Sequence, residues 1–122
     1  MGRRKRRDQD VLVAKIVFPV HDMGVAVAFY QSLGFEVESY DDGYAWVRHG
    51  GSEVLHLTLV ADLDRDANHA AGYWHVLDVD HWHERFTAAG DACADVVTQP
   101  WGMREFRLVD PSGNLLRVGE NQ

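Results

Sequence analysis

Hydrophobic and polar residues alternate along several short stretches of this chain. Near the C-terminus, residues 104–109 and 115–118 alternate as two strands around the turn Asp110-Pro111-Ser112-Gly113-Asn114. Proline presets one backbone angle of such a turn, and Gly113 or Asn114 tolerates the positive φ that closes it. Residues 44–48 and 54–59 form a similar pair around a glycine-rich turn. The pattern therefore predicts two β-hairpins, one in each half of the chain.

Two further segments predict helices that are framed in the same way. An aspartate precedes each helix and a glycine follows it, as Asp22 and Gly34 and again as Asp78 and Gly90. The aspartate accepts hydrogen bonds from the first helical N–H groups, and the glycine ends the helix in a left-handed conformation. Helical spacing predicts one buried face in each helix. These faces are Val25, Phe29 and Leu33 in the first helix and Val79, Trp82 and Phe86 in the second.

The chain contains this unit twice. Asp22 and Asp78 lie 56 residues apart, and Leu55 and Leu116, near the ends of the two units, lie 61 apart. Each unit reads as strand, helix and three strands. The sequence therefore predicts an α+β fold of two tandem βαβββ modules, about residues 12–60 and 72–119, joined by a polar linker.

Length and charge narrow the class of protein. The 122 residues suffice for one domain, expected over residues 12–122. Acidic residues number 19 and basic residues 12, and five of the basic ones form the run Arg3, Arg4, Lys5, Arg6, Arg7. Without that run, 7 basic residues face 19 acidic ones, a net charge of −12. Such a body repels nucleic acid and attracts cationic ligands. We interpret residues 1–11 as a disordered tail; the alternative is an arm that binds nucleic acid or a membrane.

The sequence shows no targeting segment and a single cysteine. No apolar run approaches the roughly 18 residues of a transmembrane helix, and the basic N-terminus lacks the apolar core of a secretory signal. The single cysteine, Cys93, excludes an internal disulfide and fits a reducing cytoplasm. We interpret Cys93 as a small strand residue rather than a nucleophile.

Three strings resemble a known family. Residues 19–37 (PVHDMGVAVAFYQSLGFEV) and 110–118 (DPSGNLLRV) are similar to the first strand and helix and to the last hairpin of the vicinal oxygen chelate superfamily. Residues 99–106 (QPWGMREF), followed by the turn, most resemble the bleomycin resistance proteins of that superfamily. The resemblance implies sheets that curve into a groove, with the helices on the convex side. It also implies homodimers whose grooves take residues from both subunits and whose first strand, near Pro19, is often exchanged.

The enzymes of this superfamily bind a divalent metal in the groove, and the resemblance locates the ligand positions. They lie on the first and last strand of each module and correspond here to Lys15, His56, Ala71 and Arg117. A divalent ion needs three or four N, O or S donors, whereas only His56 is an ordinary ligand. We therefore expect no metal and no cofactor.

The groove is expected to be aromatic instead. Strand alternation directs several side chains to its face, and acidic residues stand near its opening. The candidate ligand-binding residues are Tyr44, Trp46, His56, Tyr73, His75, Arg107, Trp101 near the rim, and Glu38. The resemblance matches Tyr44, Tyr73 and Trp101 with aromatic positions that line the drug groove of the bleomycin resistance proteins. Such rings bind planar heteroaromatic groups and cations, although they also suit a core or a dimer interface.

These features favour a cytoplasmic, homodimeric binding protein that sequesters a cationic planar antibiotic of the bleomycin type without chemistry. The alternative from another class is a metal-dependent enzyme of the same superfamily, a lyase or a dioxygenase with shifted ligands. A third hypothesis is a binding protein for another natural product, such as an enediyne or a mitomycin-like compound. Groove aromatics select for flatness more than for identity, so the sequence leaves these ligands open.

Overall fold

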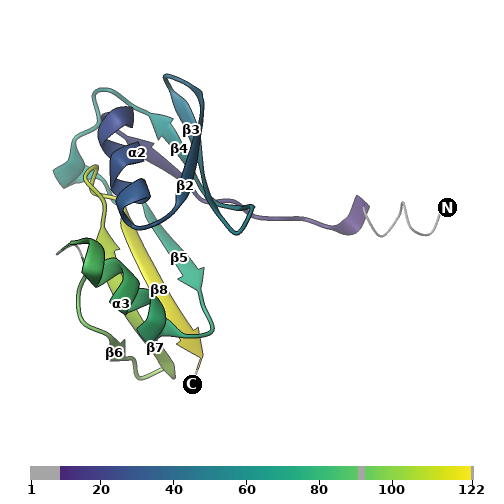
Figure 1. Ribbon diagram of the computed structural model, residues 1–122, viewed down its shortest axis with the longest axis vertical. Coiled ribbons are helices and arrows are strands. Elements are labelled where there is room, and N and C mark those ends of the chain that lie inside the picture. Colours follow the sequence, from purple (N-terminus) through teal and green to yellow (C-terminus); the bar gives the residue numbers. More distant parts are fainter. Residues whose placement is uncertain (1–8, 91–92, 122) are drawn as a thin grey trace.

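The computed structural model describes residues 9–90 and 93–121 (Figure 1). The basic run Arg3–Arg7 lies outside this part of the chain. The first module contains β1 (Val17–Val20), α2 (Met23–Ser32), β2 (Glu36–Asp41), β3 (Tyr44–His49) and β4 (Ser52–Leu59). A short 3-10 helix, η1 (Arg65–Ala67), leads to the second module, which contains β5 (Ala71–His75), α3 (Val79–Ala89), β6 (Val97–Thr98), β7 (Met103–Val109) and β8 (Leu115–Asn121). The predicted α+β fold of two βαβββ modules is confirmed.

The two modules build their sheets in the same way. The first sheet has the strand order β1-β4-β3-β2 and the second has the order β5-β8-β7-β6. In each, the first strand runs parallel to the last and the other pairs are antiparallel. Parallel neighbours need a long crossover connection, which begins with α2 or α3. The modules follow one another along the molecule, each with its helix across its sheet (Figure 1).

Strand alternation predicts the core correctly at most positions. Most side chains that alternation directs inward are almost completely buried: Phe18, Val20, Ala45, Val47, Leu55, Leu57, Phe106 and Leu108. Three more pack against this core and are partly buried: Ile16, Trp74 and Val76. On β8, Leu116 and Val118 are buried as well. Leu59 is an exception, since it is 38% exposed at the end of its strand. Among described helices none is long and apolar enough to cross a membrane.

The helix predictions are partly correct. Asp22 and Asp78 cap their helices, accepting hydrogen bonds from the backbone N–H groups of Val25 and His81. In α3, Val79 and Phe86 are buried as expected. In α2 the predicted face is wrong at Val25, which is 44% exposed, because the buried stripe runs through Ala26, Tyr30 and Leu33.

The turn at residues 110–114 holds the two modules together. Asp110 is buried, and its carboxylate accepts hydrogen bonds from the Tyr30 hydroxyl (2.7 Å) and from the backbone N–H of Asn114 (3.0 Å). The Asn114 amide donates to the backbone oxygen of Pro19 (2.8 Å). Burial, followed by the charge of Asp110, raises the pKa of Tyr30 well above its usual value. The last hairpin is thus bonded to the first helix and the first strand.

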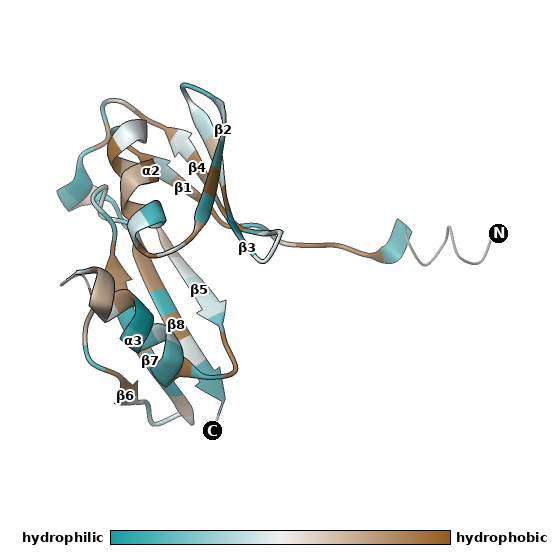
Figure 2. Cartoon of the chain, viewed as in Figure 1, coloured by the Kyte–Doolittle hydropathy of each residue, from teal (hydrophilic) through white to brown (hydrophobic). Residues whose placement is uncertain are grey.

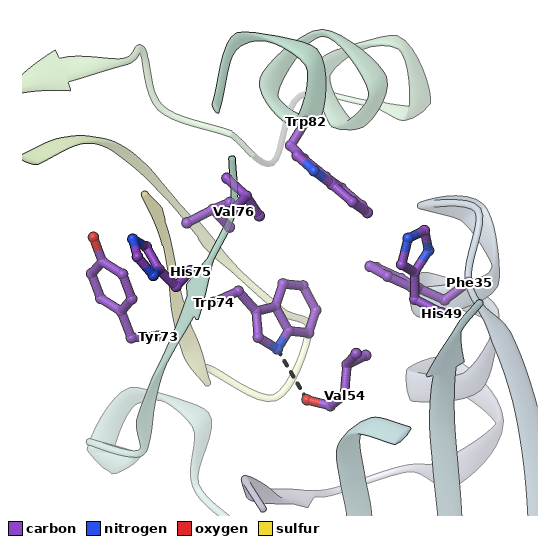
Figure 3. Close-up of a pocket in the computed structure, with 9 residues that line it drawn as sticks. Phe35, His49, Val54, Tyr73, Trp74, His75, Val76 and Trp82 are labelled. Atoms are coloured by element: carbon purple, nitrogen blue, oxygen red, sulfur yellow. Dashed lines mark hydrogen bonds between the residues drawn. The ribbon is translucent and has the colours of Figure 1, made fainter. Parts of the chain in front are cut away.

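A second contact lies where the edge strands β1 and β5 approach each other. A Cβ on Gly72 would lie 2.9 Å from the Ile16 Cδ1 atom and 3.3 Å from the Phe18 Cζ atom, closer than ordinary packing allows. The Trp74 indole N–H donates to the backbone oxygen of Val54 (3.0 Å; Figure 3). A residue without a side chain at position 72 therefore lets the modules pack closely.

Candidate functional site

The solvent-facing side of the first sheet carries three of the predicted residues together. Trp46 on β3 pairs directly with His56 on β4, and Tyr44 lies two residues before Trp46 on the same face. The Tyr44 hydroxyl lies 2.7 Å from the His56 Nδ1 atom. The ring centroids of Tyr44 and Trp46 are 6.3 Å apart, with their planes nearly perpendicular. Tyr44, Trp46 and His56 form one cluster, as the alternation predicts.

Glu53 extends this cluster and was not predicted. Its Oε1 atom lies 2.6 Å from the His56 Nε2 atom, so both ring nitrogens of His56 have partners. The hydrogen bond from His56 is the main reason that the pKa of Glu53 is lowered. Residues three apart on a regular strand face opposite ways, but a β-bulge at Val54 interrupts the pairing of β3 with β4. The bulge brings Glu53 to the His56 side, and no simple alternation reveals it.

Trp46, which is half-buried, is the centre of an aromatic surface on this sheet. Tyr40, which lies in a second irregularity, on β2, contacts it with ring centroids 5.8 Å apart. The Arg48 guanidinium lies 5.6 Å from the Trp46 ring centroid and forms an ion pair with Glu38. A shallow pocket next to these rings is lined by Tyr40, Asp41, Gly43, Tyr44 and Trp46. Glu38 is therefore beside the aromatic surface, although Arg48 already balances its charge.

The second sheet carries its own polar cluster, centred on Glu105 of β7. Glu105 is 4% exposed, and its carboxylate accepts hydrogen bonds from the Tyr73 hydroxyl (2.9 Å) and the Gln99 amide (3.3 Å). Arg117 on β8 lies 3.4 Å from the same carboxylate, and Arg107 stands directly opposite Arg117. Burial and then the bond to Glu105 raise the pKa of Tyr73 to about 12.

The predicted site residues thus fall into separate groups. Among the described residues, no hydrogen bond, ion pair or ring contact joins the Tyr44, Trp46 and His56 cluster to Tyr73 or Arg107. His75 is exposed at the edge of another cavity, and Trp101 is 67% exposed between β6 and β7. One chain therefore carries two separate clusters on two sheets, and the ligand-binding role of all eight residues stays a prediction.

A third feature, missed by alternation, is an apolar cavity between the modules (Figure 3). It has a volume of about 230 Å³ and an aromatic lining that includes Phe35, Trp74 and Trp82. The Phe35 and Trp82 rings are nearly parallel, with centroids 6.3 Å apart, and His49 contacts Trp82 at 4.8 Å. These side chains come from both modules, so only the packing of one module on the other brings them together.

The four positions at which the resemblance implies metal ligands do not fit a metal. Ala71 has no donor atom, and the Lys15 ammonium donates to the backbone oxygen of Glu53 (3.3 Å). Arg117 pairs with Glu105, and both nitrogens of His56 are engaged. Within residues 9–90 and 93–121, no three His, Cys, Asp or Glu side chains converge as a metal site requires.

Cys93 has the environment of a structural residue. It is half-buried and packs against the core, and its backbone forms an isolated antiparallel β-bridge with Leu108 of β7. Burial raises the pKa of its thiol. Reactive cysteines have a lowered pKa, because the thiolate is the nucleophile, so this environment supports the structural interpretation.

Comparisons with solved structures agree with this architecture. A bleomycin-binding protein in complex with bleomycin is 25% identical, with a TM-score of 0.83 over 92% of this chain and 100% of that chain. The bleomycin-binding protein of the bleomycin producer Streptomyces verticillus, in complex with copper(II)-bleomycin, is 28% identical, with a TM-score of 0.77 over 93% and 98% of the two chains.

Enzymes share the fold as well. A lactoylglutathione lyase from Agrobacterium tumefaciens is 23% identical, with a TM-score of 0.70 over 89% of this chain and 92% of that chain. No curated protein matches the sequence. The sequence model of the Glyoxalase/Bleomycin resistance protein/Dioxygenase superfamily matches residues 12–118, and the chain therefore belongs to this superfamily.

Proposed function

We propose that this protein binds and sequesters a cationic, planar antibiotic of the bleomycin type in the cytoplasm, without chemistry. The observation that carries this proposal is the aromatic surface of exposed Tyr40 and half-buried Tyr44 and Trp46 on the first sheet, with Glu38 and Glu53 beside it. Rings of this kind stack on flat heteroaromatic groups and attract cations. The complexes that two similar structures form with bleomycin support the same ligand class.

The affinity expected from these groups is useful for sequestration. Stacking of a planar group on an aromatic side chain contributes about 1–3 kcal/mol. Two or three such contacts, with attraction from a body of net negative charge, approach the roughly −8 kcal/mol of a micromolar complex. Free drug would then fall by mass action.

We also propose that the working unit is a homodimer. One chain divides the predicted residues between two sheets, so a second copy is needed to bring the first sheet of one subunit opposite the second sheet of the other. The segment before β1 supplies a means of pairing. Val11, Leu12 and Val13 are 67%, 87% and 67% exposed and extend away from the body as an apolar arm (Figure 2). Such an arm is suited to exchange between two subunits.

Titration calorimetry with bleomycin tests the proposal. We expect saturation at about one ligand per chain, and we expect Trp46→Ala to weaken binding at least tenfold because a stacking partner is lost. Trp101→Ala is the second variant, since the sequence places Trp101 near the rim. Leu77→Ala serves as the control, because this leucine is 96% exposed and takes part in none of the contacts described for either cluster. No heat beyond dilution at high micromolar drug would reject bleomycin.

The alternative of a metal-dependent enzyme has its own test. Only His56 among the four implied positions is an ordinary ligand, and it is already bonded to Tyr44 and Glu53. Elemental analysis of the purified protein should therefore find no stoichiometric zinc, nickel, iron or manganese. A stoichiometric metal would favour the enzyme and would show that the ligands lie elsewhere.

A further inference from the structure

Two arginines stand directly opposite each other on the exposed face of the second sheet. The antiparallel register of β7 and β8 pairs Arg107 with Arg117, so both side chains project from the same face. Like charges at directly opposed positions destabilise a sheet. The stability of the fold therefore does not explain this pair.

The charge balance of the chain makes the pair more unusual. Outside the N-terminal run, seven basic residues face 19 acidic ones. Six of the seven have a partner in the structure: Lys15, Arg48, Arg65, Arg85, Arg104 and Arg117. In the part of the chain that the structure describes, no carboxylate lies within ion-pairing distance of Arg107. An exposed guanidinium thus stays available in a strongly acidic protein.

Hydrogen bonds and an ion pair fix the position of one arginine of the pair. Buried Glu105 holds Arg117 on one side, and Glu105 is itself held by Tyr73 and Gln99. Gly119 makes room for this arrangement, because a Cβ there would overlap the Tyr73 hydroxyl. Arg117 keeps a side-chain exposure of 40% and therefore has donors that face solvent. Both arginines line a pocket of about 200 Å³, with Asp95 at its wall.

We propose that this pocket binds an oxyanion, a carboxylate or phosphate group carried by the ligand. The two guanidinium groups on neighbouring strands are planar, forked N–H donors, the kind of group that binds the oxygens of a carboxylate or phosphate. An anion between them also removes the repulsion of the pair. This inference rests on the proposed function in one respect: the ligand must contact the face of the second sheet that carries the two arginines. It adds that the ligand carries an acidic group as well as a cationic, planar part.

The experiment compares two flat probes that differ in charge. Binding of 2-naphthoate and of neutral 2-naphthamide is measured by NMR titration of the full chain. We expect the wild type to bind 2-naphthoate at least tenfold more tightly than the amide, and we expect Arg107→Gln to remove this preference. Arg65→Gln is the matched control, since it removes one positive charge from η1, outside both clusters. It should leave the preference intact.

A second readout separates binding from folding. Because the like-charge pair is relieved, Arg107→Gln without ligand should melt at or above the temperature of the wild type. Competition by inorganic phosphate would indicate that the oxyanion alone is recognised, and no competition would indicate that the ring is needed as well; both support the site.

Equal affinity for the two probes would overturn the oxyanion site, as would an equal loss of preference in Arg107→Gln and Arg65→Gln. If the protein binds bleomycin but shows no preference for 2-naphthoate, only this inference fails. If it prefers 2-naphthoate but does not bind bleomycin, only the bleomycin assignment fails.

Discussion

Features of single residues decide which side chains meet on the two sheet faces. The bulge at Val54 brings Glu53 beside His56, and the bare Gly119 lets the Tyr73 hydroxyl reach Glu105 across β8. Both clusters depend on the course of the backbone as much as on the residues that form hydrogen bonds.

Glu53→Gln should reduce the loss of folding stability that occurs as the pH falls. The folded pKa of Glu53 is lowered, chiefly by the bond from His56. Its stabilising contribution is therefore present above the unfolded pKa of about 4.3 and is lost as the pH falls through the folded value. We expect urea midpoints of the wild type to drop more than those of Glu53→Gln between pH 6 and pH 3. Glu36→Gln controls for net charge on the same sheet, and equal drops in all three proteins would contradict the expectation.

Gly119→Ala should free the Tyr73 hydroxyl. The added methyl group occupies its position, so the bond to Glu105 breaks and the pKa of Tyr73 falls from about 12 toward the ordinary value near 10. Alkaline spectrophotometric titration would show one more tyrosine that ionises early. Tyr73→Phe identifies the step that belongs to Tyr73. A titration identical to that of the wild type would mean that the ring keeps its position.

At the level of elements, one turn joins the two modules by buried hydrogen bonds, in addition to their apolar packing. Asp110 and Asn114 are buried, and they bond the β7–β8 hairpin to α2 and β1. His21 contributes as well, since its backbone N–H donates to the Ser112 hydroxyl (3.1 Å). Buried polar groups with complete partners give a unique arrangement, and a missing partner is costly.

Tyr30→Phe should therefore destabilise the whole fold. The substitution removes one donor from the buried Asp110 carboxylate while leaving the ring in the core. We expect a loss of about 1–3 kcal/mol in the free energy of unfolding, measured by urea denaturation. Tyr40→Phe is the matched control, because Tyr40 is 70% exposed and should change stability by less than about 0.5 kcal/mol. Equal effects of the two variants would show that the hydrogen bond from Tyr30 to Asp110 does not stabilise the fold.

For the whole molecule, the separation of the two sheet faces is the main consequence of the architecture. The first sheet presents aromatic and acidic groups, and the second presents the arginine pair. If two copies pair as proposed, each groove combines both chemistries. The exposed apolar arm at residues 11–13 is the feature that allows a direct test.

Leu12→Asp should weaken the proposed dimer. Exchange between subunits would bury Leu12, and a buried carboxylate without a partner is strongly unfavourable. Sedimentation velocity at several concentrations should find a dimer for the wild type and a monomer for Leu12→Asp. Leu77→Asp, at another highly exposed leucine, should remain dimeric. A wild type that sediments as a monomer would contradict the dimer proposal.

Local pattern determined much of this protein. Period-two alternation predicted most of the buried strand residues from Phe18 to Leu108, the aspartate caps predicted where both helices begin, and the repeat predicted two modules. These features depend on neighbours in sequence, which a linear pattern records. Tertiary structure alone decided the rest. The bulge at Val54, the burial of Ala26 rather than Val25, and the cavity between Phe35 and Trp82 arise from contacts between distant segments, whose packing sets the final orientation of each side chain.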